Sequence, residues 1–189
     1  ITIIYMHKYV GIVIVAILIG FTACRKPTNF SDDKSLKISF STDTVTFDTV
    51  FTSIGSSTRQ LMIYNGNDEN LKISSIRLES GNLSQFSINV DGQSGHKFSD
   101  IEIYAKDSIY VFVRVTINPN DLNNPFFVED KLIFETNDNR QIVNLTAYGQ
   151  NANYIVADQY INGFPKFKII ADSLQEVHWT AERPYVVYG

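Results

Sequence analysis

The sequence predicts an all-β protein whose main body is an antiparallel β-sandwich, and three observations lead to this fold class. Between Leu36 and Gln150, short stretches alternate apolar and polar residues with a period of two, the pattern of strands with one buried face. Turn-forming residues interrupt these stretches at regular spacing. The 13 Phe and 10 Tyr favour strands, and a charged fraction of only 19% argues against intrinsic disorder.

We expect about nine strands in this body, because nine segments combine the alternation with flanking turn residues. In chain order they cover residues 36–40, 45–47, 59–64, 71–78, 86–90, 101–104, 108–117, 131–136 and 141–148. Hairpins are expected at residues 105–107 (AKD) and 137–140 (NDNR). Since each strand offers one apolar face, two sheets packed face to face share a core, and a body of this length can bury one without disulfides.

The N-terminal segment has the features of an export signal. His7 and Lys8 form a short positive region, and residues 11–21 are an uninterrupted run of eleven apolar residues. A spanning helix needs about 20 residues, whereas the apolar part of a secretory signal needs about 7–15. We therefore expect residues 1–23 to form a signal peptide or anchor helix that precedes the sandwich, with the natural start at Met6.

Cys24, the only cysteine, follows this apolar run directly after two small residues. The segment 21–24 (FTAC) resembles the lipobox of bacterial lipoproteins, with Phe21 where Leu is usual. The resemblance implies that the signal is cut before Cys24, that its thiol receives a diacylglyceryl group and that its new amino group is acylated. Each buried CH2 group contributes about 0.8 kcal/mol to such an anchor. The alternative is a free cysteine at the end of a membrane anchor.

These features predict a location as well as an anchor. A lipidated chain of this kind belongs at the bacterial outer membrane, on either the periplasmic face or the cell surface. Residues 24–35 are polar and lack periodicity, so we expect them to form a tether between the lipid and the sandwich of residues 36–150.

Motifs within the body carry a second resemblance. Residues 47–56 (FDTVFTSIGS) lead through a Gly-Ser turn into a strand that ends in Asn65, residues 71–76 (LKISSI) follow, and residues 145–149 (LTAYG) close the segment. This arrangement resembles immunoglobulin-like domains of the abnormal-spindle/hydin kind, which are common in Bacteroidota lipoproteins. The resemblance covers residues 36–150 and implies an immunoglobulin-like sandwich that acts as a spacer or interaction module.

The C-terminal segment differs in character from the body. Trp179 and Thr180 precede residues 184–189 (PYVVYG), an aromatic and β-branched run. In the Bacteroidota lipoproteins that the chain resembles, such a stretch leads into a right-handed parallel β-helix. We expect residues 151–189 to be a linker and the start of a truncated second module, and the alternative is a short tail packed on the sandwich.

Composition excludes several function classes without naming an activity. A formal net charge of -4 predicts no basic face for nucleic acid. One Cys and three His exclude a disulfide framework and leave little room for a zinc site. His96 and His178 lack a recognisable acid–base partner, and turn chemistry explains the oxygen-rich residues 65–70 (NGNDEN) as well as a calcium site does. We expect no catalytic residue, no metal and no cofactor.

Four Asp-Ser/Thr-aliphatic triplets are the remaining candidate sites. Their hydroxyl residues are Thr44, Thr49, Ser108 and Ser173. The triplets are similar to the acceptor motif for O-glycosylation of exported Bacteroidota proteins, although chance and strand composition also produce so short a motif.

The leading hypothesis is a non-catalytic, lipid-anchored envelope protein whose sandwich acts as a spacer or interaction module. One alternative is a glycan- or protein-binding module of the cell envelope, in which exposed aromatics form a sugar-stacking platform. The period-two placement of most aromatics instead favours a core role for them. Another alternative is the non-catalytic N-terminal part of a β-helix polysaccharide-active enzyme. The expected partners are the membrane, through the lipid, and a glycan or envelope protein.

Overall fold

A computed structural model describes residues 29–119, 126–170 and 178–188 of the chain. Residues from Ser31 onward form one compact unit. The predicted signal peptide or anchor helix, Cys24 and Ser173 lie outside the described residues. Within the described ranges, no helix is long and apolar enough to cross a membrane. The described helical structure is a single 3-10 turn, Gly81–Leu83.

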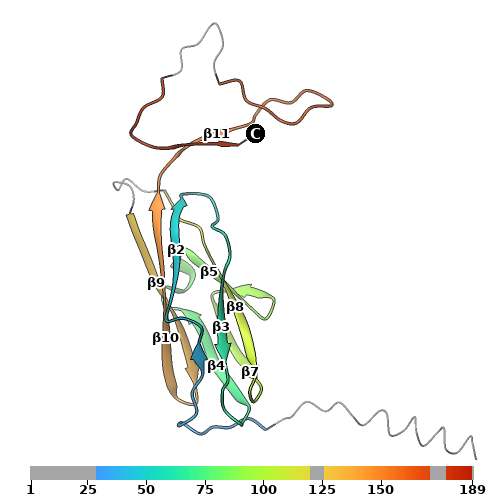
Figure 1. Cartoon of the computed structure of the whole chain (residues 1–189), viewed down its shortest axis with the longest axis vertical. Helices are drawn as coiled ribbons and strands as arrows, with labels where there is room; N and C mark the ends of the chain where they lie inside the picture. Colours follow the sequence, from blue (N-terminus) through green and yellow to red (C-terminus); the bar gives the residue numbers. More distant parts are fainter. Residues whose placement is uncertain (1–28, 120–125, 171–177, 189) are drawn as a thin grey trace, which may run out of the picture. The chain divides into compact units, whose positions relative to one another are not determined.

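The fold-class prediction is confirmed: the body is an immunoglobulin-like β-sandwich (Figure 1). Its described strands form two five-stranded sheets, here called sheet A and sheet B. Sheet A has the order β1 (Ser39–Phe40), β3 (Arg59–Tyr64), β8 (Ser108–Val115), β5 (Phe86–Val90) and β6 (Gln93–Gly95). Sheet B has the order β2 (Thr44–Phe51), β10 (Asn139–Gln150), β9 (Phe126–Thr136), β4 (Leu71–Leu78) and β7 (Lys97–Ile103).

The core lies between the two sheets, and the alternation along each strand explains its composition. On β8 the buried residues are Val111, Val113 and Val115, because every second side chain of a strand points to the same face. Rings from opposite sheets meet in this core, with the centroids of Phe47 and Phe86 6.1 Å apart. The shared core therefore consists of the inward-facing residues that the period-two pattern predicts.

Several local predictions are confirmed to the residue. The bounds of β3, β4 and β5 coincide with the predicted segments. The hairpin at residues 137–140 is also present, because Asn139 pairs with Thr136 and leaves a two-residue turn. Both turn residues, Asn137 and Asp138, have positive φ (49° and 60°), the conformation of a type I′ turn, which suits the twist of a hairpin.

The prediction of a hairpin at residues 105–107 is wrong. Residues 105–107 join β7, which pairs with β4 in sheet B, to β8, which pairs with β3 and β5 in sheet A. The segment is therefore a crossover between sheets. Turn residues between two alternating stretches show that the chain reverses, but they do not show whether the second strand pairs with the first or joins the opposite sheet.

Two further differences concern the number and direction of the strands. The short edge strand β6, Gln93–Gly95, was missed because it contains no apolar residue and so has no alternation. In addition, β2 runs parallel to β10, whereas the other described pairs within the two sheets are antiparallel.

Both edge strands of sheet B contain an aspartate at an irregular position. On β2, the register with β10 skips Asp48. On β7, Asp100 has a φ of 55° in the middle of the strand. Bulges and charges on an edge strand disfavour pairing with another chain, so these residues protect sheet B against edge-to-edge association.

Beyond the sandwich, β11 (Asn153–Val156) pairs with β12 (Tyr185–Tyr188) in a two-stranded parallel sheet. The aromatic and β-branched run at residues 185–188 is thus a strand. The assignment of residues 151–189 to a linker and a second module, and of residues 24–35 to a tether, stays a prediction.

Candidate functional site

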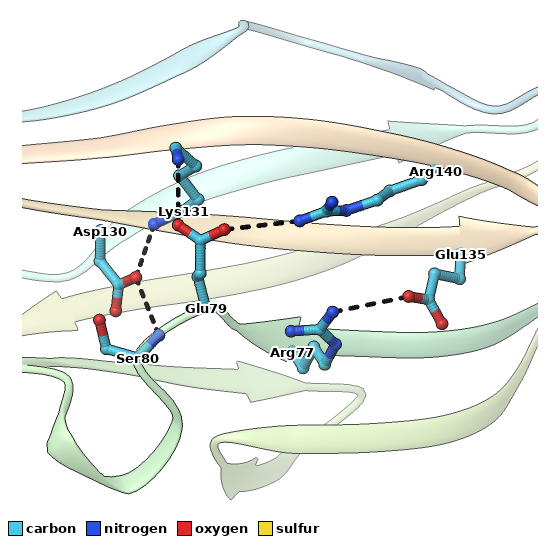
Figure 2. Close-up of polar contacts among 7 residues, drawn as sticks. All are labelled: Arg77, Glu79, Ser80, Asp130, Lys131, Glu135 and Arg140. Atoms are coloured by element: carbon cyan, nitrogen blue, oxygen red, sulfur yellow. Dashed lines mark hydrogen bonds and ion pairs between the residues drawn. The ribbon is translucent and has the colours of Figure 1, made fainter.

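Ion pairs cover the central part of the outer face of sheet B (Figure 2). The carboxylate of Glu79 lies between Lys131, at 3.0 Å, and Arg140, at 3.4 Å. A second pair joins Arg77 to Glu135 at 3.6 Å. Exposed pairs of this kind contribute about 0–1 kcal/mol each. They make this part of sheet B a charged, solvated surface.

A polar cavity of about 360 Å³ lies beside these pairs. Among its lining residues, Asp130 is only 8% exposed, and its Oδ1 accepts backbone N–H bonds from Ser80 (3.2 Å) and Lys131 (2.7 Å). Figure 2 shows this carboxylate, which belongs to strand β9, joined by dashed lines to Lys131 and to Ser80 in the turn after β4. Its Oδ2 has no hydrogen-bond partner among the described residues. The main role of Asp130 is therefore to hold the turn at Ser80 against sheet B.

The outer face of sheet A is different in character. Tyr110 and Phe112 lie on β8, the central strand of this sheet, and remain 45% and 40% exposed. Their ring centroids are 6.2 Å apart, and the ring planes differ by only 18°. Arg114 is the next outward residue on the same strand. We call these three residues the aromatic platform.

Neutral polar side chains border the platform. In the registers of β3 and β5, Gln60 and Asn89 lie directly opposite Phe112 from either side. The Asn89 amide donates to the Ser94 hydroxyl at 3.1 Å. A cavity of about 350 Å³ is lined by Phe112 and Arg114 and by the polar residues Asn89, Ser94, Ser87 and Thr58. Aromatic rings thus adjoin groups that can both donate and accept hydrogen bonds.

Charge distinguishes the two sheets as well. The described strands of sheet A contain no Asp or Glu, and their charged residues are Arg59 and Arg114. Arg59 is paired with Asp48 at 3.7 Å. Within the described part of the chain, Arg114 has no carboxylate within ion-pair distance. The platform therefore presents one cation with no counter-charge, in a chain whose formal net charge is -4.

The predicted modification sites do not form one cluster. Thr44 begins β2 and lines the polar cavity of sheet B, and Thr49 is exposed near the end of the same strand. Ser108 begins β8 in sheet A, and its backbone N–H donates to Asp107 Oδ1 at 2.7 Å.

O-glycosylation of these residues stays a prediction, which the intact mass of the protein purified from its native host tests. We expect the measured mass to exceed the summed masses of the polypeptide and its lipid, because an attached glycan adds its own mass. A mass equal to lipid plus polypeptide contradicts the prediction.

The oxygen-rich turn at residues 65–70 is explained by its own hydrogen bonds. The buried Asn65 side chain donates to the carbonyl of Glu69 in the same turn and to that of Ile103 on β7. Asp68 forms an ion pair with Lys106 at 2.9 Å. Across the described ranges, no group of three His, Cys, Asp or Glu side chains is placed to hold a metal. The geometry of this turn therefore favours turn chemistry over a calcium site.

Sequence reasoning missed the aromatic platform because both faces of β8 contain apolar residues. In residues 108–117 (SIYVFVRVTI), β-branched aliphatic residues occupy one set of alternate positions, and Tyr110, Phe112 and Arg114 occupy the other. The sequence did contain a signal for the platform. The two aromatic residues share their face of the strand with an arginine, and such a face can be exposed to solvent. The expectation that aromatics mostly belong to the core is wrong for these two rings.

No family model matches the sequence, and no curated protein matches it. A family 123 glycoside hydrolase from Clostridium perfringens matches with 9% identity over 64% of this chain and 30% of its own, at a TM-score of 0.42. A protein of unknown function from Porphyromonas gingivalis W83 matches with 12% identity over 63% of this chain and 57% of its own, also at 0.42.

The ASH/PapD-like domain of human CEP192 matches with 12% identity over 69% of this chain and 94% of its own, at a TM-score of 0.39. The chain thus spans about a third of the hydrolase and just over half of the Porphyromonas protein. Likeness at this level of identity concerns the fold alone. The observed topology of two packed five-stranded sheets by itself defines the domain as an immunoglobulin-like β-sandwich.

Proposed function

We propose that this chain is a non-catalytic lipoprotein of the bacterial outer membrane, anchored through Cys24, whose sandwich serves as a rigid spacer and interaction module. The spacer role rests on one observation. Residues 33–34 are hydrogen-bonded to the sandwich at one end of β10, and the chain leaves the sandwich at the other end of this strand.

The fastening involves the turn between β9 and β10. The Asn137 side-chain amide donates to the Asp33 carbonyl at 2.8 Å, and the Asn139 amide donates to the Lys34 carbonyl at 2.9 Å. Lys34 Nζ lies 2.7 Å from Asp138 Oδ2. The hydrogen bond and the charge attraction between these two groups raise the pKa of Lys34 and lower the pKa of Asp138. Residues 33–34 are therefore held to this turn.

Strand β10 connects this turn to the opposite end of the sandwich. It contains 12 residues, from Asn139 to Gln150, and at about 3.3 Å per residue it spans about 40 Å. It pairs with β9 from Asn139 to Gly149 and with β2 from Asn144 to Gln150, which makes it a stiff element. Nine peptide steps separate Cys24 from Asp33, a reach of at most about 30 Å. An anchor at Cys24 thus keeps the β9–β10 turn close to the membrane and presents the Gln150 end outward.

Lipidation of Cys24 is tested by growing cells with an alkyne analogue of palmitate. We expect the wild-type chain to take up the label and Cys24→Ser to lose it, because the acyl chains depend on a cysteine at that position. Ser35→Ala serves as the matched control and retains the label. Labelling of Cys24→Ser at the wild-type level contradicts the lipid anchor.

The spacer role predicts that the two ends of the sandwich lie at different distances from the membrane. In the lipidated chain Cys24 is blocked, so a thiol introduced by Glu69→Cys or Thr49→Cys accepts a fluorophore selectively. Glu69 lies in the loop whose Asn70 carbonyl accepts a hydrogen bond from Ser31, near the entry of the chain, and Thr49 pairs with Tyr148 near the exit. On vesicles with acceptor lipids, we expect stronger energy transfer from position 69. Equal transfer, or stronger transfer from position 49, rules out the proposed orientation.

A further inference from the structure

We propose that the aromatic platform binds an acidic polysaccharide, with Tyr110 and Phe112 stacking under neutral sugar rings and Arg114 binding the carboxylate of an adjacent uronic acid. This inference rests on the interaction-module part of the proposed function and does not depend on the lipid anchor. It assigns a ligand class to sheet A and residue roles to three consecutive outward positions of β8.

The exposed aromatic rings are the first argument. β8 is paired on both sides, with β3 and β5, so Tyr110 and Phe112 are central in their sheet. Large apolar groups at such positions are normally either covered or used for binding. The two ring planes differ by only 18°, so both exposed rings have nearly the same orientation along the strand. The C–H-rich face of a pyranose ring packs on an aromatic ring while its hydroxyl groups point outward.

The polar border supplies what sugar hydroxyls need. Each hydroxyl is both a donor and an acceptor, and the side-chain amides of Gln60 and Asn89 offer both functions on either side of Phe112. The hydroxyls of Ser87, Ser94 and Thr58 line the same cavity. These groups are uncharged, so they can exchange water for sugar hydroxyls without the larger desolvation cost of an ion.

Arg114 selects for an anionic ligand. A guanidinium binds a carboxylate through two parallel N–H bonds, and this one lacks a described ion-pair partner. The guanidinium lies against a glycine: a Cβ added to Gly55 would stand 2.9 Å from Arg114 Nη2 and would displace this flexible group. Arg114 and Phe112 line the same cavity.

Other occupants fit this face less well. If a second copy docked by the same face, Arg114 would approach its equivalent with no acidic residue in the strands of either sheet A to compensate. A nucleic acid carries a phosphate at every nucleotide and needs several cations, whereas the platform has one. A uronic acid flanked by neutral sugars matches one cation followed by two rings.

The test measures binding of the lipidated full chain, in detergent, to oligosaccharides of hyaluronan, chondroitin, gellan and xanthan, which combine uronic acids with neutral sugars. We expect at least one to bind with a dissociation constant below about a millimolar, and its carboxyl-reduced form to bind about tenfold more weakly. Tyr110→Ala and Phe112→Ala should weaken both forms. Arg114→Gln and Gly55→Ala should weaken only the carboxylated form, because they remove or displace the guanidinium.

A matched control pair lies on sheet B. Phe127 and Tyr148 are also exposed, and their ring centroids lie 5.4 Å apart, but the ring planes differ by 57°. The next outward residue on β9 is the acidic Glu129. Phe127→Ala and Tyr148→Ala should leave glycan binding unchanged. Thermal unfolding of every variant separates lost binding from lost folding.

Three outcomes overturn the inference: no binding to any of the four glycans at millimolar concentration, equal binding of an oligo(dT) probe, or sensitivity to the sheet B pair instead of the platform. The palmitate label is followed on the same samples. If the wild-type chain takes up the palmitate label but binds none of the glycans, this inference alone is contradicted. If the wild-type chain takes up no label, the proposed function is contradicted.

Discussion

Replacing Asn65 by Ala is expected to lower the free energy of unfolding by about 2–4 kcal/mol, a large effect for one polar residue. Asn65 is 1% exposed. Its Nδ2 donates to the carbonyls of Glu69, at 2.8 Å, Ile103, at 3.2 Å, and Tyr104, at 3.0 Å. Its Oδ1 accepts from Asn67. One side chain therefore joins the β3–β4 loop to the end of β7.

The size of this effect follows from what the substitution leaves behind. Alanine cannot donate, so the carbonyl groups of Ile103 and Tyr104 lose a partner in a buried or half-buried place. An unsatisfied buried polar group costs about 1–3 kcal/mol, more than a typical hydrogen bond contributes in net terms. Urea unfolding of the mature chain, followed by far-ultraviolet circular dichroism, measures the change.

Asn82→Ala is the matched control, because Asn82 is exposed in the turn Gly81–Leu83 and should change the free energy of unfolding by less than about 0.5 kcal/mol. Asn65→Asp extends the test. Burial and three facing carbonyls raise the folded-state pKa of the new carboxyl above its unfolded value of about 3.9. The stability of this variant relative to wild type should thus be greatest at low pH and fall as pH rises. Equal stability of Asn65→Ala and Asn82→Ala contradicts the assigned role.

Replacing Gly149 by Ala is the second large effect, with an expected loss of about 1–3 kcal/mol in the free energy of unfolding. Gly149 on β10 pairs directly with Phe126 on β9. A Cβ at position 149 would lie 2.5 Å from two atoms of the Phe126 ring and 3.0 Å from Ile117 Cγ2. The ring packs over the glycine where a side chain would otherwise stand, so the added methyl group forces a nearly buried ring to move.

Gly66→Ala controls for the general effect of removing a glycine, since nothing lies within 4 Å of the new methyl group, and it should change stability by less than about 0.5 kcal/mol. A second variant tests the cause. In a Phe126→Leu background the ring is absent, and Gly149→Ala should then cost less than it does alone, which a double-mutant cycle measures. If the two substitutions add without interaction, contact with the ring is not the reason for the loss.

These two residues show how differently the sequence informs on neighbouring features. Asn65 was expected as a turn residue because Asn and Gly follow an alternating stretch, a purely local signal. Its bonds to Ile103 and Tyr104 join residues nearly forty positions apart, and no local pattern encodes that contact. Gly149 closes a motif on which the immunoglobulin-like resemblance rests, yet its reason for being glycine is the ring of Phe126 on the neighbouring strand.

The local order of the chain follows from the sequence alone. The all-β class, the bounds of β3, β4 and β5, and the turn at Asn137 and Asp138 depend on residues close together in the chain, and each was predicted. The features decided by tertiary structure were the crossover at residues 105–107, the parallel pairing of β2 with β10, and the exposure of Tyr110 and Phe112. A period of two shows that one face of a strand is buried, but only packing decides which sheet the strand joins and which face stays open to solvent.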